Sequence, residues 1–222
     1  FMEPAPAETE PTYLSRLSQA LFSTLIPSLS IGVFLASTYY FLDYFSLLRS
    51  DIQPLLWSLF SVVILVYFVY RLARAILAPR RPNWRLLPVR SQAAQWLLVL
   101  AVVTAIATGF DYFMDQVYLL FGSQLSLTVA TSLVATVIVG LLIMAIGGVS
   151  PLDDEEGRPK QWPLKFRYLL FALGAAIIIA AMLGYIGFAR FLSQQAVVTG
   201  AIIATMYIGF LTAGAITSEG AF

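Results

Sequence analysis

The chain has 222 residues, of which 59% are hydrophobic and 11% charged, and its formal net charge is +1. A mean hydropathy of +0.84 lies far above the range of water-soluble domains, so most of its surface must face lipid. Neither histidine nor cysteine occurs, which excludes disulfides, thiolate or imidazole metal sites and every catalytic arrangement built on Cys or His.

Six apolar stretches are each long enough to cross a hydrocarbon core about 30 Å thick as helices that rise about 1.5 Å per residue. A polar stretch precedes them, residues 1–17, whose Pro-, Glu- and Ala-rich start predicts a flexible linker. The expected spans are approximately 21–45, 54–77, 93–110, 125–146, 168–188 and 196–216. We therefore predict an all-α fold, a polytopic transmembrane helix bundle over residues 18–222.

The first apolar stretch leaves two arrangements open. Pro27 interrupts it and can either kink a membrane helix or mark its first turn. Residues 13–25 then belong to the first span or form a separate helix on the membrane surface. Because the chain opens Phe-Met and has no signal peptide at its start, we expect it to be a piece of a longer polypeptide.

The connector between the second and third spans collects much of the positive charge. We expect its arginines, with one tryptophan at headgroup depth, to anchor the chain at the membrane surface: Arg71, Arg74, Arg80, Arg81, Trp84, Arg85 and Arg90. They serve either as a topology signal alone or also as a grip on anionic lipid headgroups, each worth roughly 1 kcal/mol. Anionic lipids are thus the predicted partner, and no nucleic acid is expected.

Basic residues alternate between rich and poor connectors along the chain. Arg158, Lys160, Lys165 and Arg167 lie between spans four and five, whereas Arg49 and Arg190 are each alone in their connectors. Since connectors rich in Lys and Arg stay in the cytoplasm, we predict that spans two, four and six end there.

Small residues recur every four positions on three of the spans, which places them on one helix face. This spacing predicts close helix packing, with a polar stripe lining a conduit as the alternative. The residues are Ala101, Ala105 and Gly109 on span three, Thr128, Ser132, Thr136 and Gly140 on span four, and Thr205, Gly209 and Ala213 on span six.

Acidic residues are scarce within the predicted spans. Asp43, Asp111 and Asp115 lie at span ends, where we expect solvated or capping carboxylates, with an ion or proton relay as the alternative. The acidic run at 153–156 lacks the alternation and the distal Glu of a calcium loop. We predict no catalytic residue, metal site or cofactor, and no enzyme activity.

Two stretches resemble the membrane region of large bacterial members of the MscS mechanosensitive channel superfamily, upstream of the pore. They are "RLARAILAPRRPNWRLLPV", residues 71–89, and "ARFLSQQAVVTGAIIATMYIGFLTAGAITSEGAF", residues 189–222. The resemblance implies a multi-pass protein of the bacterial inner membrane, extra helices outside a heptameric ring, and a pore helix and cytoplasmic β-rich domain later in the chain. No pore residue can be carried over to this sequence.

The resemblance leaves the position of residue 1 open. An even number of spans with a cytoplasmic end places it inside, whereas members of that family usually carry a periplasmic N-terminal region. Either a further span precedes residue 1, or the count near Pro27 differs by one.

Three functions follow as hypotheses. The first is a lipid-facing sensor or scaffold region that transmits membrane tension to a pore outside this segment. The second is a subunit of a small-solute carrier. The third is a membrane anchor or assembly module without conduction of its own.

Overall fold

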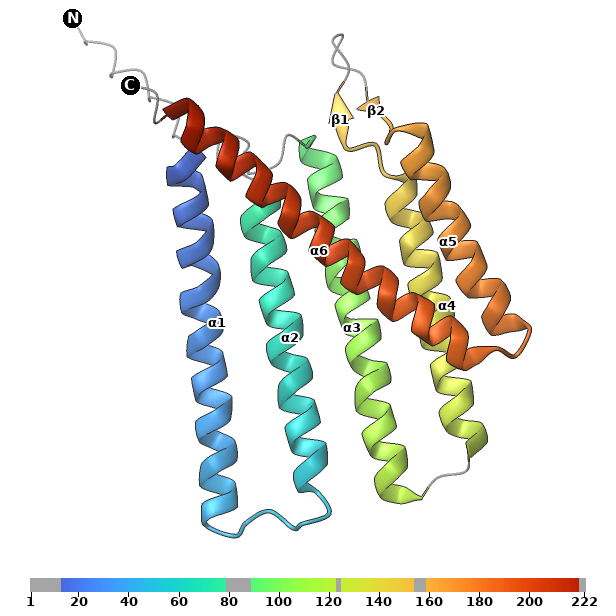
Figure 1. Cartoon of the computed structure of the whole chain (residues 1–222). Coiled ribbons are helices and arrows are strands. Elements are labelled where there is room, and N and C mark those ends of the chain that lie inside the picture. Colours follow the sequence, from blue (N-terminus) through green and yellow to red (C-terminus); the bar gives the residue numbers. More distant parts are fainter. Residues whose placement is uncertain (1–12, 79–88, 123–124, 154–158, 220–222) are drawn as a thin grey trace, which may run out of the picture.

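Six long helices and one short hairpin make up the computed structural model, which describes residues 13–78, 89–122, 125–153 and 159–219 (Figure 1). The helices are α1 (Tyr13–Tyr44), α2 (Gln53–Leu77), α3 (Ser91–Phe121), α4 (Leu125–Gly148), α5 (Leu164–Met182) and α6 (Ile186–Glu219). Between α4 and α5, strand β1 (Leu152–Asp153) pairs antiparallel with β2 (Pro159–Lys160).

Each of the six helices is long and apolar enough to cross a membrane, with candidate spans of 19 to 31 residues. This confirms the prediction of an all-α polytopic bundle, and the protein is a multi-pass membrane protein. Helix ends follow from local chemistry: Pro54 lies in the first turn of α2, and Gly122 ends α3 in the left-handed conformation, with φ of 58°.

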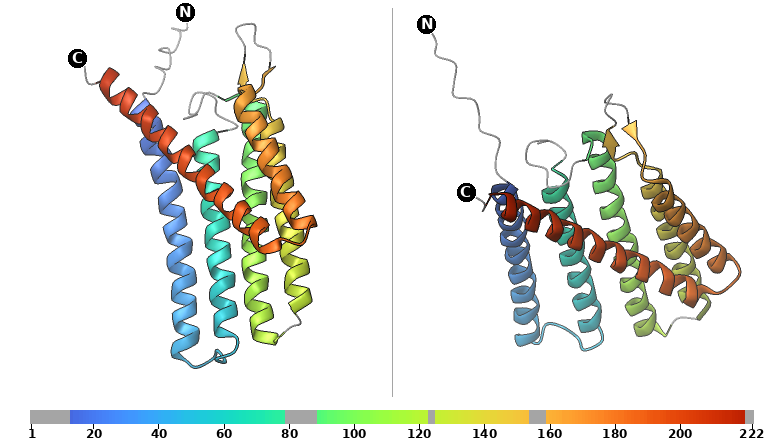
Figure 2. Two further views of the ribbon diagram at one scale, coloured as in Figure 1. Left: turned by 45° about the vertical axis from the view of Figure 1, so that its right-hand side comes forward. Right: turned by 45° about the horizontal axis from the view of Figure 1, so that its top comes forward.

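The first four helices lie in a row, each antiparallel to the next (Figure 1). Helix α5 packs beside α4, and α6 then crosses one face of the row diagonally, from the end of α5 to the start of α1 (Figure 2). Most helices therefore contact mainly their neighbours in the sequence. The row leaves wide helix surfaces to the surrounding lipid.

The tightest packing lies between α4 and α5. A Cβ atom added to Gly174 would lie 2.7 Å from the carbonyl oxygen of Gly140, so only glycine allows these backbones to approach so closely. Val139, Ile143 and Ile177 form a small buried cluster beside this contact. Elsewhere large apolar side chains point outward, as Phe34 does on α1 at 68% exposure.

The structure differs most from the predicted spans at four helix ends. α1 begins at Tyr13, inside the predicted linker, and runs unbroken past Pro27, so residues 13–25 belong to α1 and form no separate surface helix. α3 continues eleven residues beyond the predicted end at 110, to Phe121. α5 ends at Met182, where Gly184 turns the chain with a φ of 87°, and α6 starts at Ile186.

Candidate functional site

Four polar side chains from three helices meet between α3, α4 and α6. Arg190 Nη2 lies 2.9 Å from Asp111 Oδ2 and also forms an ion pair with Asp115. Ser132 Oγ donates a hydrogen bond of 3.0 Å to the other carboxylate oxygen of Asp111. We call these four residues the ion-pair cluster.

The sequence builds the ion-pair cluster from simple helix geometry. Asp111 and Asp115 are four residues apart and so share one face of α3. Arg190 is the fifth residue of α6, so the short α5 and the tight turn after it bring its guanidinium to that face. The planar fork of arginine carries five N–H donors, which suits it to two carboxylates at once.

The two aspartates of the ion-pair cluster lie within the candidate membrane span of α3, Ser91–Phe121. Asp111 stands eleven residues before Gly122, about 16 Å along the helix axis, and is only 7% exposed. The side chains of Asp115 and Arg190 are 24% and 28% exposed. With two carboxylates and one guanidinium, the group carries a formal charge of −1, and charges at this depth require a partner.

One donor of the ion-pair cluster has no acceptor. Arg190 Nε is buried and forms no hydrogen bond among the described residues.

A second polar link between α3 and α4 lies nearer their connector, where Thr131 Oγ1 and Tyr118 Oη are 2.8 Å apart. Together these contacts join α3 to α4 and to the start of α6.

The prediction of a solvated carboxylate at a span end is wrong for Asp111. α3 continues past this residue because Arg190 and Ser132 satisfy its carboxylate within the protein. Arg190 itself lies in α6 and not in a connector. Asp43 does lie exposed at the end of α1, where it accepts a hydrogen bond of 3.1 Å from Gln53 Nε2.

The sequence carries a signal for the ion-pair cluster that becomes visible only when different spans are compared. Asp111 and Asp115 are four residues apart on one helix, and Arg190 is the single arginine of a connector on the same predicted side of the membrane. Because isolated charges are costly in a membrane, these three residues are candidates to form ion pairs. Asp115 and Arg190 are 75 positions apart in the sequence, so neither span by itself indicates that they pair.

The small residues predicted to pack helices fall into two groups. On α3 and α4 they lie at helix contacts: Ala105, Gly109, Ser132, Thr136 and Gly140 are buried, and Ala101 and Thr128 are half-buried. A Cβ on Gly109 would come within 2.7 Å of Val62 on α2. On α6, by contrast, Thr205, Gly209 and Ala213 are exposed, and a Cβ on Gly209 would meet nothing within 4 Å.

Arg71, one of the predicted lipid anchors, has an internal role. Its Nε donates to the backbone carbonyl of Ser23 on α1 at 3.1 Å, and its Nη2 donates to the same oxygen. Pro27 has no N–H, so the Ser23 carbonyl lacks the helical donor that residue 27 would otherwise supply. Arg71 thus satisfies the backbone group that the proline of α1 leaves open, which explains why α1 continues through Pro27.

The other predicted anchors differ in their contacts. Arg74 Nη1 donates to Tyr70 Oη at 3.0 Å, and the backbone N–H of Arg90 donates to the Pro151 carbonyl at 2.8 Å. Arg80, Arg81, Trp84 and Arg85 lie outside the described residues. Most of the acidic run at 153–156 does too, and the described residues contain no group of three or more acidic side chains that could hold a metal ion.

Comparison with known proteins does not assign the chain to a family. No protein-family model matches the chain, and neither a search of curated proteins nor one of solved structures finds a match. The resemblance to the MscS superfamily therefore stays a prediction.

Proposed function

We propose that this segment is the lipid-facing sensor or scaffold region of an MscS-like mechanosensitive channel, which transmits membrane tension to a pore outside the segment. The observation that carries the proposal is the arrangement of α1 to α4 as a row, with α6 held across it by the ion-pair cluster (Figures 1 and 2). The resemblance of residues 71–89 and 189–222 points to the same class of protein.

A row of helices couples to bilayer thickness more strongly than a compact bundle, because more of its surface touches lipid. In α1 and in α2, only 6% of the most apolar 18-residue stretch is buried within the protein. Tension thins the bilayer, and helices longer than the hydrocarbon core respond by tilting. The row would then spread or flatten, at a cost of fractions of a kcal/mol per ångström of mismatch.

Helix α6 is the element that can pass such a movement on. Its start is tied to α3 by Arg190, while its second half has exposed apolar side chains such as Met206 and Phe210. In the proposed channel the pore follows α6 in the chain. A change in the tilt of α3 would move α6, and it would shift the gating equilibrium by the difference in its coupling to the closed and open states.

Patch recordings test this proposal on the polypeptide that carries the segment, expressed in cells without mechanosensitive channels of their own. We expect a tension-activated conductance whose threshold moves when the six arginines of the 71–90 region are replaced by glutamine. The absence of any tension-activated conductance would overturn the proposal. An unchanged threshold would remove these arginines from the sensor.

The ion-pair cluster also favours a second candidate function, a carrier subunit. A half-buried group with a formal charge of −1 is the kind of intramembrane site that ion- and proton-coupled carriers use. A carrier should be stabilised by its substrate, so a rise in the unfolding temperature of the purified protein with one solute class would favour this function. The sensor proposal predicts no such rise.

A further inference from the structure

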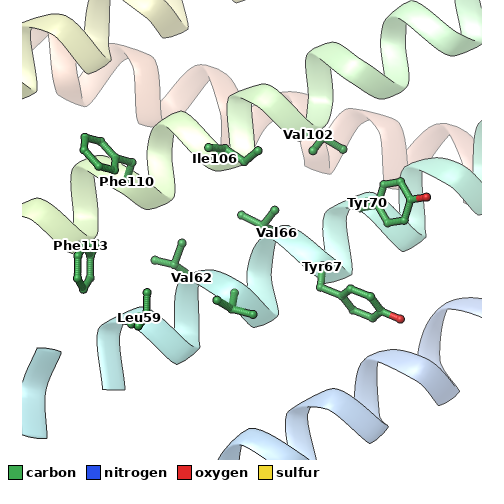
Figure 3. A pocket seen from close by; sticks show the side chains of 10 residues that line it. Leu59, Val62, Val66, Tyr67, Tyr70, Val102, Ile106, Phe110 and Phe113 are labelled. Atoms are coloured by element: carbon green, nitrogen blue, oxygen red, sulfur yellow. The ribbon is translucent and has the colours of Figure 1, made fainter. Parts of the chain in front are cut away.

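An apolar groove runs between α2 and α3, away from the ion-pair cluster (Figure 3). From its shape and from the charge at one end, we propose that it binds one acyl chain of an anionic phospholipid, whose headgroup is held at Arg74. This inference requires only that the helices span a membrane, and it stands whether or not the segment senses tension.

The groove exists because short side chains line its middle and large ones its ends. Val62 and Val66 on α2 face Val102 and Ile106 on α3 along its length, and Phe113 lies at one end (Figure 3). The helices touch closely where Val62 meets Gly109, so the space beside that contact stays open. Its volume is about 480 Å³, within the range of about 300–1,000 Å³ for small-molecule sites.

The groove opens to the lipid and not to the interior of the protein. Figure 3 shows α6 passing behind the α3 ribbon, beyond the groove side chains. Val63, Ile106 and Phe110 on its rim are 44%, 48% and 50% exposed. Water is excluded at this depth, so hydrocarbon must fill the space.

The length of the groove matches a lipid tail from one leaflet. From Leu59 to Tyr70 the α2 helix rises about 16 Å, roughly half of a hydrocarbon core about 30 Å thick. Tyr67 and Tyr70 line the end toward the arginine-rich connector, and Leu59 lies at the opposite end. Because α2 runs from Gln53 to Leu77, a tail that enters beside the tyrosines passes the midpoint of the helix, near residue 65, and ends beside Leu59.

Polar groups at the tyrosine end select the headgroup. Arg74 Nη1 donates to the Tyr70 hydroxyl at 3.0 Å, which holds the guanidinium over this end of the groove. Its side chain is exposed, and among the described residues no carboxylate pairs with it. Its remaining donors are therefore available to a phosphate, and the positive charge favours an anionic lipid over a zwitterionic one.

Among the described arginines of this region, Arg74 is the one that contacts a residue of the groove. Arg71, one helical turn before it, already donates to the Ser23 carbonyl of α1. A single basic residue near an anionic headgroup corresponds to about a fivefold preference in binding. That preference is the quantity the experiment measures.

Native mass spectrometry of the purified protein, incubated with equal amounts of phosphatidylglycerol and phosphatidylcholine of identical tails, tests the site. We expect one tightly retained phosphatidylglycerol per chain. Val66→Phe, which fills the groove, should abolish retention of this lipid, as should Val63→Phe at the more exposed rim. Val99→Phe, on an exposed face of α3 outside the groove, is the matched control and should retain it.

The headgroup is tested separately. Arg74→Gln should lower the preference for phosphatidylglycerol about fivefold while a tail still binds. Arg167→Gln, an arginine on α5 far along the chain from the groove, should leave the preference unchanged. Equal retention in Val66→Phe, Val63→Phe and Val99→Phe would overturn the site. Oleate binding as tightly as phosphatidylglycerol, with no effect of Arg74→Gln, would overturn the assignment of the headgroup.

Discussion

Replacing Arg71, which donates to the carbonyl that Pro27 leaves without a helical donor, should destabilise the α1–α2 pair. Replacing Pro27 as well should cancel most of that effect. In Arg71→Met the side chain keeps an unbranched apolar stem but loses every donor to the Ser23 carbonyl. In Pro27→Ala the backbone N–H of residue 27 returns and can bond the same carbonyl within the helix. The two substitutions therefore act on one oxygen atom from two sides.

The size of the effect follows from the kind of hydrogen bond. A hydrogen bond to a charged group contributes roughly 1.5–3 kcal/mol in water-soluble proteins. Side-chain hydrogen bonds between membrane helices average nearer 0.6 kcal/mol, with a maximum of about 1.7. We expect Arg71→Met to lower the free energy of unfolding by about 1–2 kcal/mol, and by less than about 0.5 kcal/mol in the Pro27→Ala background.

Reversible unfolding in mixed micelles measures both costs in a double-mutant cycle. Arg74→Met is the matched control, because Arg74 lies one turn away and its hydrogen bond stays within α2. Its cost should not depend on residue 27. An Arg71→Met cost that is the same in the unaltered chain and in the Pro27→Ala variant would refute the link between the arginine and the proline.

Three further predictions concern the ion-pair cluster, the α4–α5 contact and the orientation of the chain. Arg190→Met leaves the carboxylates of Asp111 and Asp115 without their cationic partner and should lower the free energy of unfolding by about 3–5 kcal/mol. Adding Asp111→Asn and Asp115→Asn should restore much of that free energy, and no recovery in the triple variant would contradict the pairing. In Gly174→Ala the added Cβ would lie 2.7 Å from an α4 carbonyl oxygen. This overpacking should lower the free energy of unfolding by about 1–3 kcal/mol, while Gly209→Ala should not lower it. In this cysteine-free chain, Arg80→Cys and Arg85→Cys should react with an impermeant thiol reagent only after the cells are opened, and labelling of intact cells would reverse the predicted orientation.

The sequence was sufficient to predict the six spans because a hydrocarbon core allows few alternatives. Continuous apolar stretches of this length must be helical to satisfy their backbone groups. The bounds of α2 were predicted almost to the residue, since Pro54 marks its first turn and arginines follow its end. Sequence and structure agree wherever local composition alone decides.

The prediction failed where a charge in the spans has a partner far along the chain. Asp111 looked like the end of a span because a lone carboxylate is costly in lipid, and its partner Arg190 arrives only through the short α5. Arg71 looked like a surface anchor because its acceptor, a carbonyl freed by Pro27, lies 48 residues away on α1. Both relations depend on which helices pack together, and hydropathy carries no information about that.

Spin-label distances across the row of helices test the central proposal most directly, since the chain has no cysteine and labels can be placed singly. One pair joins Phe34 on α1 to Ile179 on α5, both exposed, and a control pair joins Leu164 to Ile179 within α5. If the row senses tension, the α1–α5 distance shifts by several ångströms between bilayers of long-chain and short-chain lipids, while the control distance, about 22 Å, stays constant. An α1–α5 distance that is the same in both bilayers would contradict the account.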